Sequence, residues 1–477
     1  MFARETVAGV TCAAVALVLS GAPASTVPPP RAIWGDTTSR VSVGDRGQEA
    51  DGESGDGALS AQGTLVAFTS AATNLVPRDT NGMPDVFARD RSTGETRRVS
   101  IGPSGRQADG PSGRPDLPAS GRVVVFESEA SNLVPGDTNE ASDVFVRDLV
   151  TGQTRRLSTG PGGRQGDAGS GLPAISADGR TLAFTSFASN LVAGDTNGVE
   201  DVFVHSLRTG RTRQVSVATG GTRGNADGHY RPAISAHGRF VAFTSTSPDL
   251  VRGDRNGFPD VFVRDRRSGT TRRVSTGAGG VESDSASFSP AISGDGRLVA
   301  FASGGTNLVA GDTNGATDVF VRNLRAGLTR RVSVTSEETQ AAGSEFDPLP
   351  DLSRDGRLVS FTSGAADLVP GDTNGASDAF VRDRWHGTTQ IASVSTSGEQ
   401  GPRFNSALTL SADGRHLAFV SSAPNLVPDD TNELADVLVR DVVDERRPGE
   451  VPGPTTTSAA AQAGLMFWLT WKTFWMS

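Results

Sequence analysis

The chain has 477 residues, with 45 basic and 54 acidic side chains and a net charge of −9, and the basic residues form no block. This balance argues against a nucleic-acid partner, because such proteins neutralise phosphates with clustered Lys and Arg. The only cysteine is Cys12. A chain cut after Ala24 would lack cysteine, which excludes disulfides, thiol catalysis and thiolate metal sites from it.

The N-terminus has the features of a secretion signal. Residues 7–19 form an apolar run that is too short to span a bilayer, and Ala22-Pro23-Ala24 resembles a small-residue cleavage site. We therefore expect a signal peptide over residues 1–24 and a Pro-rich leader over residues 25–37. Export of a cysteine-free chain is compatible with a bacterial setting, so the expected location is secreted, periplasmic or at the cell surface.

One unit is repeated seven times along the rest of the chain. The Asp of an Asp-Thr-Asn turn recurs at steps of 58, 58, 59, 58, 60 and 58 residues, from Asp79 to Asp430. The Gly of a Ser-Ala-Asp-Gly-Arg turn recurs from Gly63 to Gly414 with the same steps. Two markers in lockstep indicate a repeated structural unit.

Each unit is predicted to contain four short antiparallel strands. In the third unit these are residues 173–176, 181–186, a strand that opens at residues 201–204, and residues 212–216, rich in Val, Phe and Thr and separated by turn residues. No stretch shows sustained helical spacing. The pattern predicts an all-β protein, a seven-bladed β-propeller with four-stranded antiparallel blades over residues 38–445.

The two ends of the repeat region predict how the ring closes. Residues 38–43 match the last strand of a unit, while the seventh unit lacks that strand after residue 440. We therefore expect the N-terminal strand 38–43 to complete the last blade, which would leave no open edge in the ring. After the propeller we expect a linker rich in Pro, Thr and Ala at 446–462 and an aromatic, hydrophobic tail at 463–477. Only this tail could provide membrane contact.

The repeat resembles a known family. The segment Pro-Ala-Ile-Ser-Ala-Asp-Gly-Arg at 173–180, followed by Asp-Val-Phe-Val at 201–204 and Thr-Gly at 209–210, resembles the WD-like propeller repeat of the TolB type. The resemblance covers residues 38–445 and implies the propeller fold. It also implies a protein-binding role in the bacterial envelope, although this chain has seven predicted blades and no separate N-terminal domain, whereas TolB has a six-bladed propeller and such a domain.

The Asp-Thr-Asn loops allow two interpretations. Oxygen ligands at short spacing suit a calcium loop, with candidate ligands Asp137, Asn139, Asp143, Asp195, Asn197 and Asp201. Alternatively, the first Asp caps the turn and the last Asp fixes the start of the third strand. No other cofactor is expected. The Arg pairs of the fourth strands are predicted to lie at the outer rim and protect the edge.

The loops that lead from one unit into the next are the predicted binding site, because they vary while the strands hardly change. In a propeller they surround one mouth of the central channel. The candidate residues are Asp51, Asp109, Asp167, Asp227, His229, Tyr230, Arg231, Asp284 and Asp347.

Three functions follow as hypotheses. The first is a secreted, non-enzymatic binding module that recognises a protein or a cell-envelope polymer at the channel mouth. The second is a propeller hydrolase or lyase with a site near His229, although the sequence has no recognisable catalytic motif. The third is a calcium-stabilised structural propeller of the cell surface.

Overall fold

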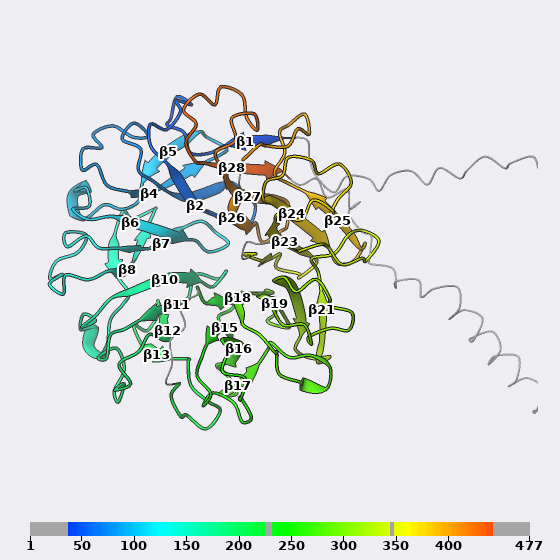
Figure 1. Ribbon diagram of the computed structural model, residues 1–477. Coiled ribbons are helices and arrows are strands. Elements are labelled where there is room, and N and C mark those ends of the chain that lie inside the picture. Colours follow the sequence, from blue (N-terminus) through cyan, green and yellow to red (C-terminus); the bar gives the residue numbers. More distant parts are fainter. Residues whose placement is uncertain (1–36, 225–230, 344–347, 404, 442–477) are drawn as a thin grey trace, which may run out of the picture. The chain divides into compact units, whose positions relative to one another are not determined.

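A computed structural model describes residues 37–224, 231–343, 348–403 and 405–441. These residues form seven four-stranded antiparallel sheets, arranged as the blades of a propeller (Figure 1). The predicted all-β, seven-bladed fold is confirmed. The predicted signal peptide, most of the predicted leader, and the predicted linker and tail lie outside the described residues.

The first strand of each blade lines the central channel. From blade one to blade seven these strands are β2 (Ser54–Leu59), β6 (Ser112–Asp116), β10 (Ser170–Ile175), β14 (Ala233–Ile234), β18 (Ser287–Ile292), β22 (Asp351–Leu352) and β26 (Asn405–Leu410). The second strands are β3 (Leu65–Ser70), β7 (Val123–Ser128), β11 (Thr181–Ser186), β15 (Phe240–Ser245), β19 (Leu298–Ser303), β23 (Leu358–Ser363) and β27 (His416–Ser421).

The outer half of each blade holds the third and fourth strands. The third strands are β4 (Asp85–Asp90), β8 (Asp143–Asp148), β12 (Asp201–Ser206), β16 (Asp260–Asp265), β20 (Asp318–Asn323), β24 (Asp378–Asp383) and β28 (Asp436–Asp441). The outermost strands are β5 (Glu95–Arg98), β9 (Thr154–Arg156), β13 (Thr212–Gln214), β17 (Thr270–Arg273), β21 (Leu328–Arg331), β25 (Thr388–Ile391) and, in blade seven, β1 (Thr38–Arg40).

The N-terminal strand closes the ring as the sequence predicts. Strand β1 pairs with β28, with Thr38 opposite Arg440 and Arg40 opposite Leu438. The strand ends at Arg40, but Val41 still donates a backbone hydrogen bond of 2.9 Å to the carbonyl of Val437. Ladder hydrogen bonds between the two ends of the repeat region therefore join the first and last blades.

The core lies within and between the blades. In blades one to six a Phe of the second strand stacks on a Phe of the third, as Phe126 does on Phe145 with ring centroids 5.8 Å apart. All twelve of these Phe side chains are fully buried. Apolar clusters also join neighbouring blades: Leu59 and Phe68 of blade one pack with Ala418 and Val439 of blade seven. Burial of this apolar surface is the main favourable contribution to folding.

Backbone hydrogen bonds encircle one end of the channel. At the hairpins between first and second strands, each turn donates a backbone N–H to the carbonyl of the next blade, over distances of 2.8–3.2 Å. These bonds run from Ala61 to Ala119 and onward until Asp413 returns to Ala61. Such close approach favours small residues, and a Cβ on Gly294 would lie 2.5 Å from the side chain of Arg354. We call this end the hairpin mouth.

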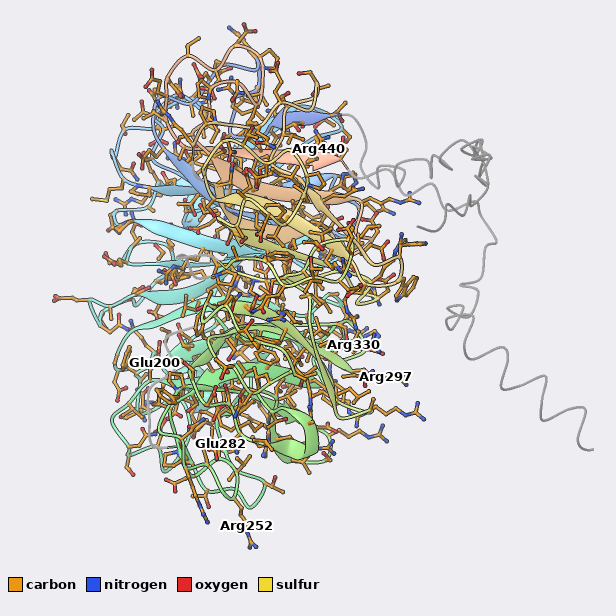
Figure 2. All side chains as sticks on the ribbon, turned by 45° about the vertical axis from the view of Figure 1, so that its right-hand side comes forward. Glu200, Arg252, Glu282, Arg297, Arg330 and Arg440 are labelled. Carbon is orange, nitrogen blue, oxygen red and sulfur yellow. The ribbon has the colours of Figure 1, made fainter. Side chains whose placement is uncertain are left out.

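The remaining structure is short loops and turns. The only described helices are three single 3₁₀ turns, η1 (Pro103–Gly105), η2 (Pro161–Gly163) and η3 (Ala278–Gly280). Among the described residues, none of these is long or apolar enough to cross a membrane. Charged side chains such as Arg252, Arg297 and Arg330 extend outward into solvent (Figure 2).

Candidate functional site

The channel has a ring of seven side chains at the end where the chain enters the innermost strands, which we call the entry mouth. One residue comes from each blade, at the same repeat position, and all seven line a channel cavity of about 610 Å³. The ring consists of Asp56, Arg114, Leu172, Arg231, Ser289, Leu349 and Ala407. The residue type changes from each blade to the next, so the ring is chemically asymmetric.

A β-bulge presents several of these side chains to the channel. The register of the first and second strands shifts in blades one, two, three, five and seven. At each shift the ring residue adopts a positive φ, for example 50° at Arg114 and 51° at Leu172. Such a backbone costs energy for a residue with a Cβ, and bulges of this kind re-aim side chains near functional sites.

Deeper in the channel the lining becomes apolar and then small. A collar of Leu and Ile side chains follows the ring, formed by Leu59, Leu117, Ile175, Ile234, Ile292, Leu352 and Leu410. Beyond it lie the Ala and Gly residues of the hairpin mouth, where Arg354 is the exception. A ligand that enters from the ring would therefore meet polar groups first and an apolar wall behind them.

The charged groups of the ring are Asp56 and two Arg side chains. Arg114 is 53% exposed, and its guanidinium lies 3.4 Å from a carboxylate oxygen of Glu127. Arg231 is 42% exposed and lies 3.5 Å from Asp116. Arg231 also donates hydrogen bonds to the carbonyls of Pro173, at 2.9 Å, and Pro115, at 3.3 Å. Its guanidinium is thus held against the wall of blades two and three while part of it faces the channel.

Two carboxylates are built into the channel wall next to the ring. Asp116 accepts backbone hydrogen bonds from Leu117 and from Ile175 of the next blade. Asp351 likewise accepts backbone hydrogen bonds from Leu352 of its own blade and from Leu410 of the next blade. Burial raises the pKa of Asp116, and it raises that of Asp351 to about 6. Each carboxylate therefore joins two blades and adds a titratable group beneath the ring.

The structure separates the residues that the sequence predicted for the mouth. Arg231 lies in the ring. Four of the predicted Asp residues do not line the channel cavity, namely Asp51, Asp109, Asp167 and Asp284. Each of them accepts two hydrogen bonds, one from the backbone N–H and one from the hydroxyl of a Thr or Ser that follows the second strand. In the same order, these donors are Thr73, Ser131, Ser189 and Thr306. Asp227, His229, Tyr230 and Asp347 lie outside the described residues, so the catalytic hypothesis stays a prediction.

The sequence reasoning missed most of the ring. Arg114, Asp56 and the two Leu residues occupy positions that a strict strand alternation does not assign to the channel, because the bulge adds a residue to the first strand. A signal was nevertheless present. The position just before the Pro that five of the seven repeats share, such as Leu172 before Pro173, varies between the repeats, while the second and third strands hardly change.

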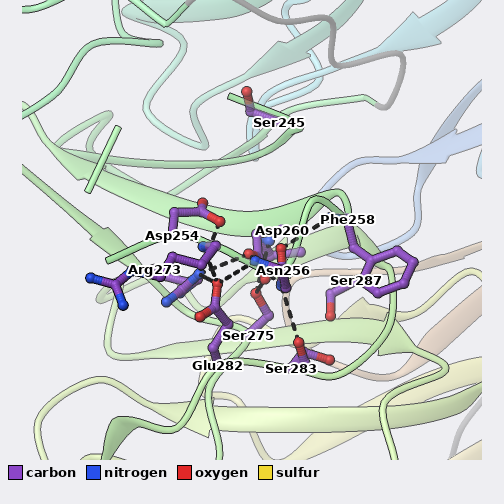
Figure 3. Close-up of polar contacts among 12 residues, drawn as sticks. Ser245, Asp254, Asn256, Phe258, Asp260, Arg273, Ser275, Glu282, Ser283 and Ser287 are labelled. Atoms are coloured by element: carbon purple, nitrogen blue, oxygen red, sulfur yellow. Dashed lines mark hydrogen bonds and ion pairs between the residues drawn. The ribbon is translucent and has the colours of Figure 1, made fainter. Parts of the chain in front are cut away.

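The Asp-Thr-Asn loops are the second polar feature, and a buried ion-pair cluster forms at most of them. In blade two the guanidinium of Arg156 lies 3.1 Å from Asp137 and 3.0 Å from Asp143. Ser158 donates to the second oxygen of Asp143, and Gln165 donates to Asp137 at 2.7 Å. Figure 3 shows the equivalent cluster of blade four, where Arg273 contacts Asp254, Asp260 and Glu282.

These clusters bear on both earlier interpretations of the loops. In blade two a guanidinium contacts both candidate calcium ligands, Asp137 and Asp143. Asn139 donates its amide to the carbonyl of Gly166 at 3.1 Å. In blade three Asn197 donates to Asp201 at 2.8 Å, and Arg223 lies 3.9 Å from Asp195. The side chains therefore already make the structural contacts of a turn and strand start.

The Arg pairs of the fourth strands divide between two roles. The first member, such as Arg155, Arg272 or Arg330, is exposed on the outer strand, as expected of an edge-protecting charge. The second member, such as Arg156 or Arg273, turns inward to the carboxylates. The prediction that both lie at the outer rim is therefore wrong for the second Arg, because its strand position alternates to the other face.

Burial controls the ionisation of the cluster carboxylates. It raises the pKa of Asp143, while the Ser158 hydrogen bond and the Arg156 charge oppose the increase. In blade four it raises the pKa of Asp254 to about 6, together with the charge of Asp260. In blade seven it raises that of Asp430 to about 6. Each cluster thus depends on its Arg to offset carboxylates that are costly to bury.

Comparison with known proteins places the chain by fold alone. No protein-family model matches it, and no curated protein matches its sequence. Among solved structures, oligogalacturonate lyase from Vibrio parahaemolyticus is similar with a TM-score of 0.50 and 12% identity, covering 86% of this chain and 94% of that one. The propeller domain of the Trilobed protease from Pyrococcus furiosus gives a TM-score of 0.49 and 10% identity, with 84% and 99% covered.

TolB from Acinetobacter baumannii is also similar, with a TM-score of 0.37 and 16% identity. The match covers 64% of this chain and spans 58% of the length of that protein. The match to the lyase, with its TM-score of 0.50, supports the β-propeller fold and nothing beyond it. At such low identity none of these matches carries an activity or ligand over to this chain.

Proposed function

We propose that this protein is an exported, non-enzymatic binding module that recognises a protein or a cell-envelope polymer at the entry mouth of its channel. The observation that carries the proposal is the ring of seven channel-facing residues. The second and third strands repeat nearly unchanged in every blade, while the ring changes from each blade to the next. Variable positions on a rigid repeated scaffold are where recognition is usually located.

The chemistry of the ring indicates the kind of group that it would bind. Arg114 and Arg231 come from blades two and four, with Leu172 between them. Leu349, which is 43% exposed, and Ala407 belong to the opposite blades six and seven. Two half-exposed guanidinium groups on one side favour a carboxylate or another anionic group. The apolar side and the Leu and Ile collar favour a ligand that also carries an apolar part.

The test is a capture experiment with the full chain as bait. Extracts of the source organism's envelope and culture medium are passed over the wild type and over the double variant Arg114→Ala, Arg231→Ala. We expect a partner that the wild type retains and the variant loses. Prior treatment of the extract with protease or with polysaccharide-degrading enzymes distinguishes a protein from a polymer.

The matched control is Arg272→Ala, Arg330→Ala, which removes the same charge from exposed positions on outer strands. It is expected to retain the partner. Melting curves of all three chains check that the ring variant is folded. Capture that is equal in the ring variant and the wild type, or absent in both, would contradict the proposal.

A further inference from the structure

The buried clusters at the Asp-Thr-Asn loops differ in one blade. In five blades the outermost strand supplies an Arg to the two carboxylates, namely Arg98, Arg156, Arg273, Arg331 and Arg40. In blade three the positions of the Arg and the neighbouring amide are exchanged, so that Gln214 lies on the strand and Arg223 provides the charge. Six of the seven clusters therefore contain a guanidinium.

Blade six has an apolar side chain at this position. Ile391 lies opposite Phe380 in the strand pairing, just as Arg331 lies opposite Phe320 in blade five. Ile391 packs against the apolar cluster of the blade. Among the described residues, no Arg or His forms an ion pair with Asp372 or Asp378, the two carboxylates of this blade.

The absence of the Arg changes the hydrogen bonds around Asp372. In blade five the side-chain amide of Gln340 donates to Asp312 at 3.0 Å. In blade six the equivalent Gln400 donates instead to the carbonyl of Gly371 at 2.9 Å. The Oδ1 atom of Asp372 is left buried without a hydrogen-bond partner among the described residues, and Asp372 is only 8% exposed.

The second carboxylate of the cluster, Asp378, is completely buried. It accepts hydrogen bonds from Ser393 at 2.6 Å, from the amide of Asn374 at 2.7 Å and from that of Asn405 at 3.1 Å. All three donors are neutral. Asn405 is the first residue of β26 in blade seven, at the repeat position that Ser287 occupies in blade five. The Oδ1 atom of Asn405 is also buried without a hydrogen-bond partner among the described residues.

Two buried carboxylates without a cation are energetically unfavourable, because their charges are desolvated and repel each other. In the equivalent cluster of blade five, Asp312 and Asp318 share one cation, since both lie 3.1 Å from the same Arg331 nitrogen. Within the part of the chain that the structure describes, the Oδ1 atom of Asp372 is a buried acceptor without a donor. The blade-six cluster therefore has a free carboxylate oxygen and negative charge that no ion pair among the described residues compensates.

We propose that the blade-six cluster of Asp372 and Asp378 is a calcium site in which these two carboxylates are the principal ligands. The cation supplies the charge that an Arg provides in the other blades. Oxygen-only donors, two of them carboxylates, suit a hard cation such as Ca²⁺ and disfavour metals that prefer nitrogen or sulfur. The site is independent of the channel mouth, so this proposal does not rest on the proposed function.

The test compares calcium binding by the wild type and by Ile391→Arg. The variant restores the guanidinium that the outermost strand supplies in blades one, two, four, five and seven. After treatment with a chelator, each full chain is titrated with CaCl₂ in a calorimeter and melted with and without calcium. For the wild type we expect binding of one calcium ion and a rise in melting temperature on the order of 2 °C or more at saturation.

For Ile391→Arg we expect loss of this binding, and a melting temperature without calcium at least as high as that of the calcium-loaded wild type. Asp372→Asn is expected to lose binding as well. Ile391→Leu is the matched control, because it changes the side chain without adding charge, and should bind like the wild type. A parallel titration with MgCl₂ tests selectivity, and weaker binding is expected.

Three results would overturn the proposal. The first is no calcium binding by the wild type. The second is binding that persists in Ile391→Arg and Asp372→Asn, which would place the ion at another cluster, such as that of Asp254, Asp260 and Glu282. The third is a wild type that gains stability on acidification but not with calcium, which would show that protons neutralise the pair.

Discussion

The ion-pair clusters at the Asp-Thr-Asn loops and the ring at the entry mouth are built in opposite ways. Each cluster uses the same few positions of the repeat and buries them. The ring uses one position of the repeat, leaves it partly exposed and changes it from each blade to the next. The comparison teaches that a change at a buried charge can be balanced by a change in its neighbours, as in blade three, where Gln214 and Arg223 exchange places. A channel-facing side chain has no such constraint.

The largest expected effect comes from removing the charge at the centre of a cluster. Arg273→Met in blade four should lower the free energy of unfolding by roughly 3–5 kcal/mol, since it leaves three carboxylates near one another without a cation. Thermal or urea unfolding of the full chain measures this. Arg272→Met is the control: it alters the exposed neighbour on the same strand and should change stability very little.

If both Met variants melted alike, the cluster would not be the stabilising element that its geometry indicates. The cluster variant can also be compared with a variant of the ring at the entry mouth, Arg114→Met, which removes an exposed guanidinium. That variant is expected to behave like Arg272→Met in unfolding experiments. A large loss of stability in Arg114→Met would contradict this expectation, because it would show that a ring residue also stabilises the fold.

A smaller effect is expected from pH. Burial raises the pKa of Asp351 to about 6, above that of the unfolded chain. The folded state therefore favours the neutral form of this carboxyl. The charged form lowers the free energy of unfolding by its full amount above pH ~6, and this loss of stability disappears below pH ~4. Asp254, Asp378 and Asp430 shift in the same direction. The melting temperature should therefore rise as the pH falls from about 6 to about 4.

Asp351→Asn should make this pH dependence less steep, because the amide does not titrate. Glu49 and Asp441 have the opposite effect, because their pKa values are lowered to about 2 in the folded state. Their charged forms stabilise the fold, and this stabilisation is lost only as the pH falls below ~4. Melting curves at half-unit pH steps measure both. An equally steep curve in Asp351→Asn would contradict the assignment of that carboxyl.

The smallest effect concerns the backbone of the ring. Ala407 has a φ of 50°, in the region that favours glycine. Ala407→Gly should stabilise the fold by about 0.5 kcal/mol, since relief of strain outweighs the greater freedom of the unfolded chain. Ala174→Gly, two positions along the same type of strand in blade three and without a positive φ, should destabilise it by about 1 kcal/mol. Effects of the same sign would argue against strain at the bulge.

Much of the scaffold could be predicted from the sequence. The spacing of Asp79 and its six equivalents gave the number of blades, because each repeat must place its strands in the same way. The matching of residues 38–43 to the missing last strand predicted closure, and the structure confirms it through Thr38 and Arg440. These features depend on local patterns, such as turn residues and alternating apolar side chains, that the chain carries in every repeat.

Arg231, Asp51 and the equivalents of Asp51 were all predicted at the mouth because they lie on the loops that lead into the innermost strands. Arg231 lines the channel cavity, and its role in binding stays a prediction. The structure shows Asp51 and its equivalents bonded to Thr73 and the corresponding hydroxyls instead. The direction of a side chain in an irregular loop depends on contacts far along the chain, and the sequence does not display these.

The sequence by itself thus determined the architecture, the closure and the general region of variability, since each follows from periodicity and turn chemistry within a single repeat. Only the tertiary structure decided which side chains face the channel, because the bulge at Arg114 and Leu172 shifts the alternation of the strand. The tertiary structure also showed that Ile391 occupies the position that holds the Arg in five of the other clusters. An apolar residue on an outer strand is unremarkable until the fold places it beside Asp372 and Asp378, where every other blade has a cation.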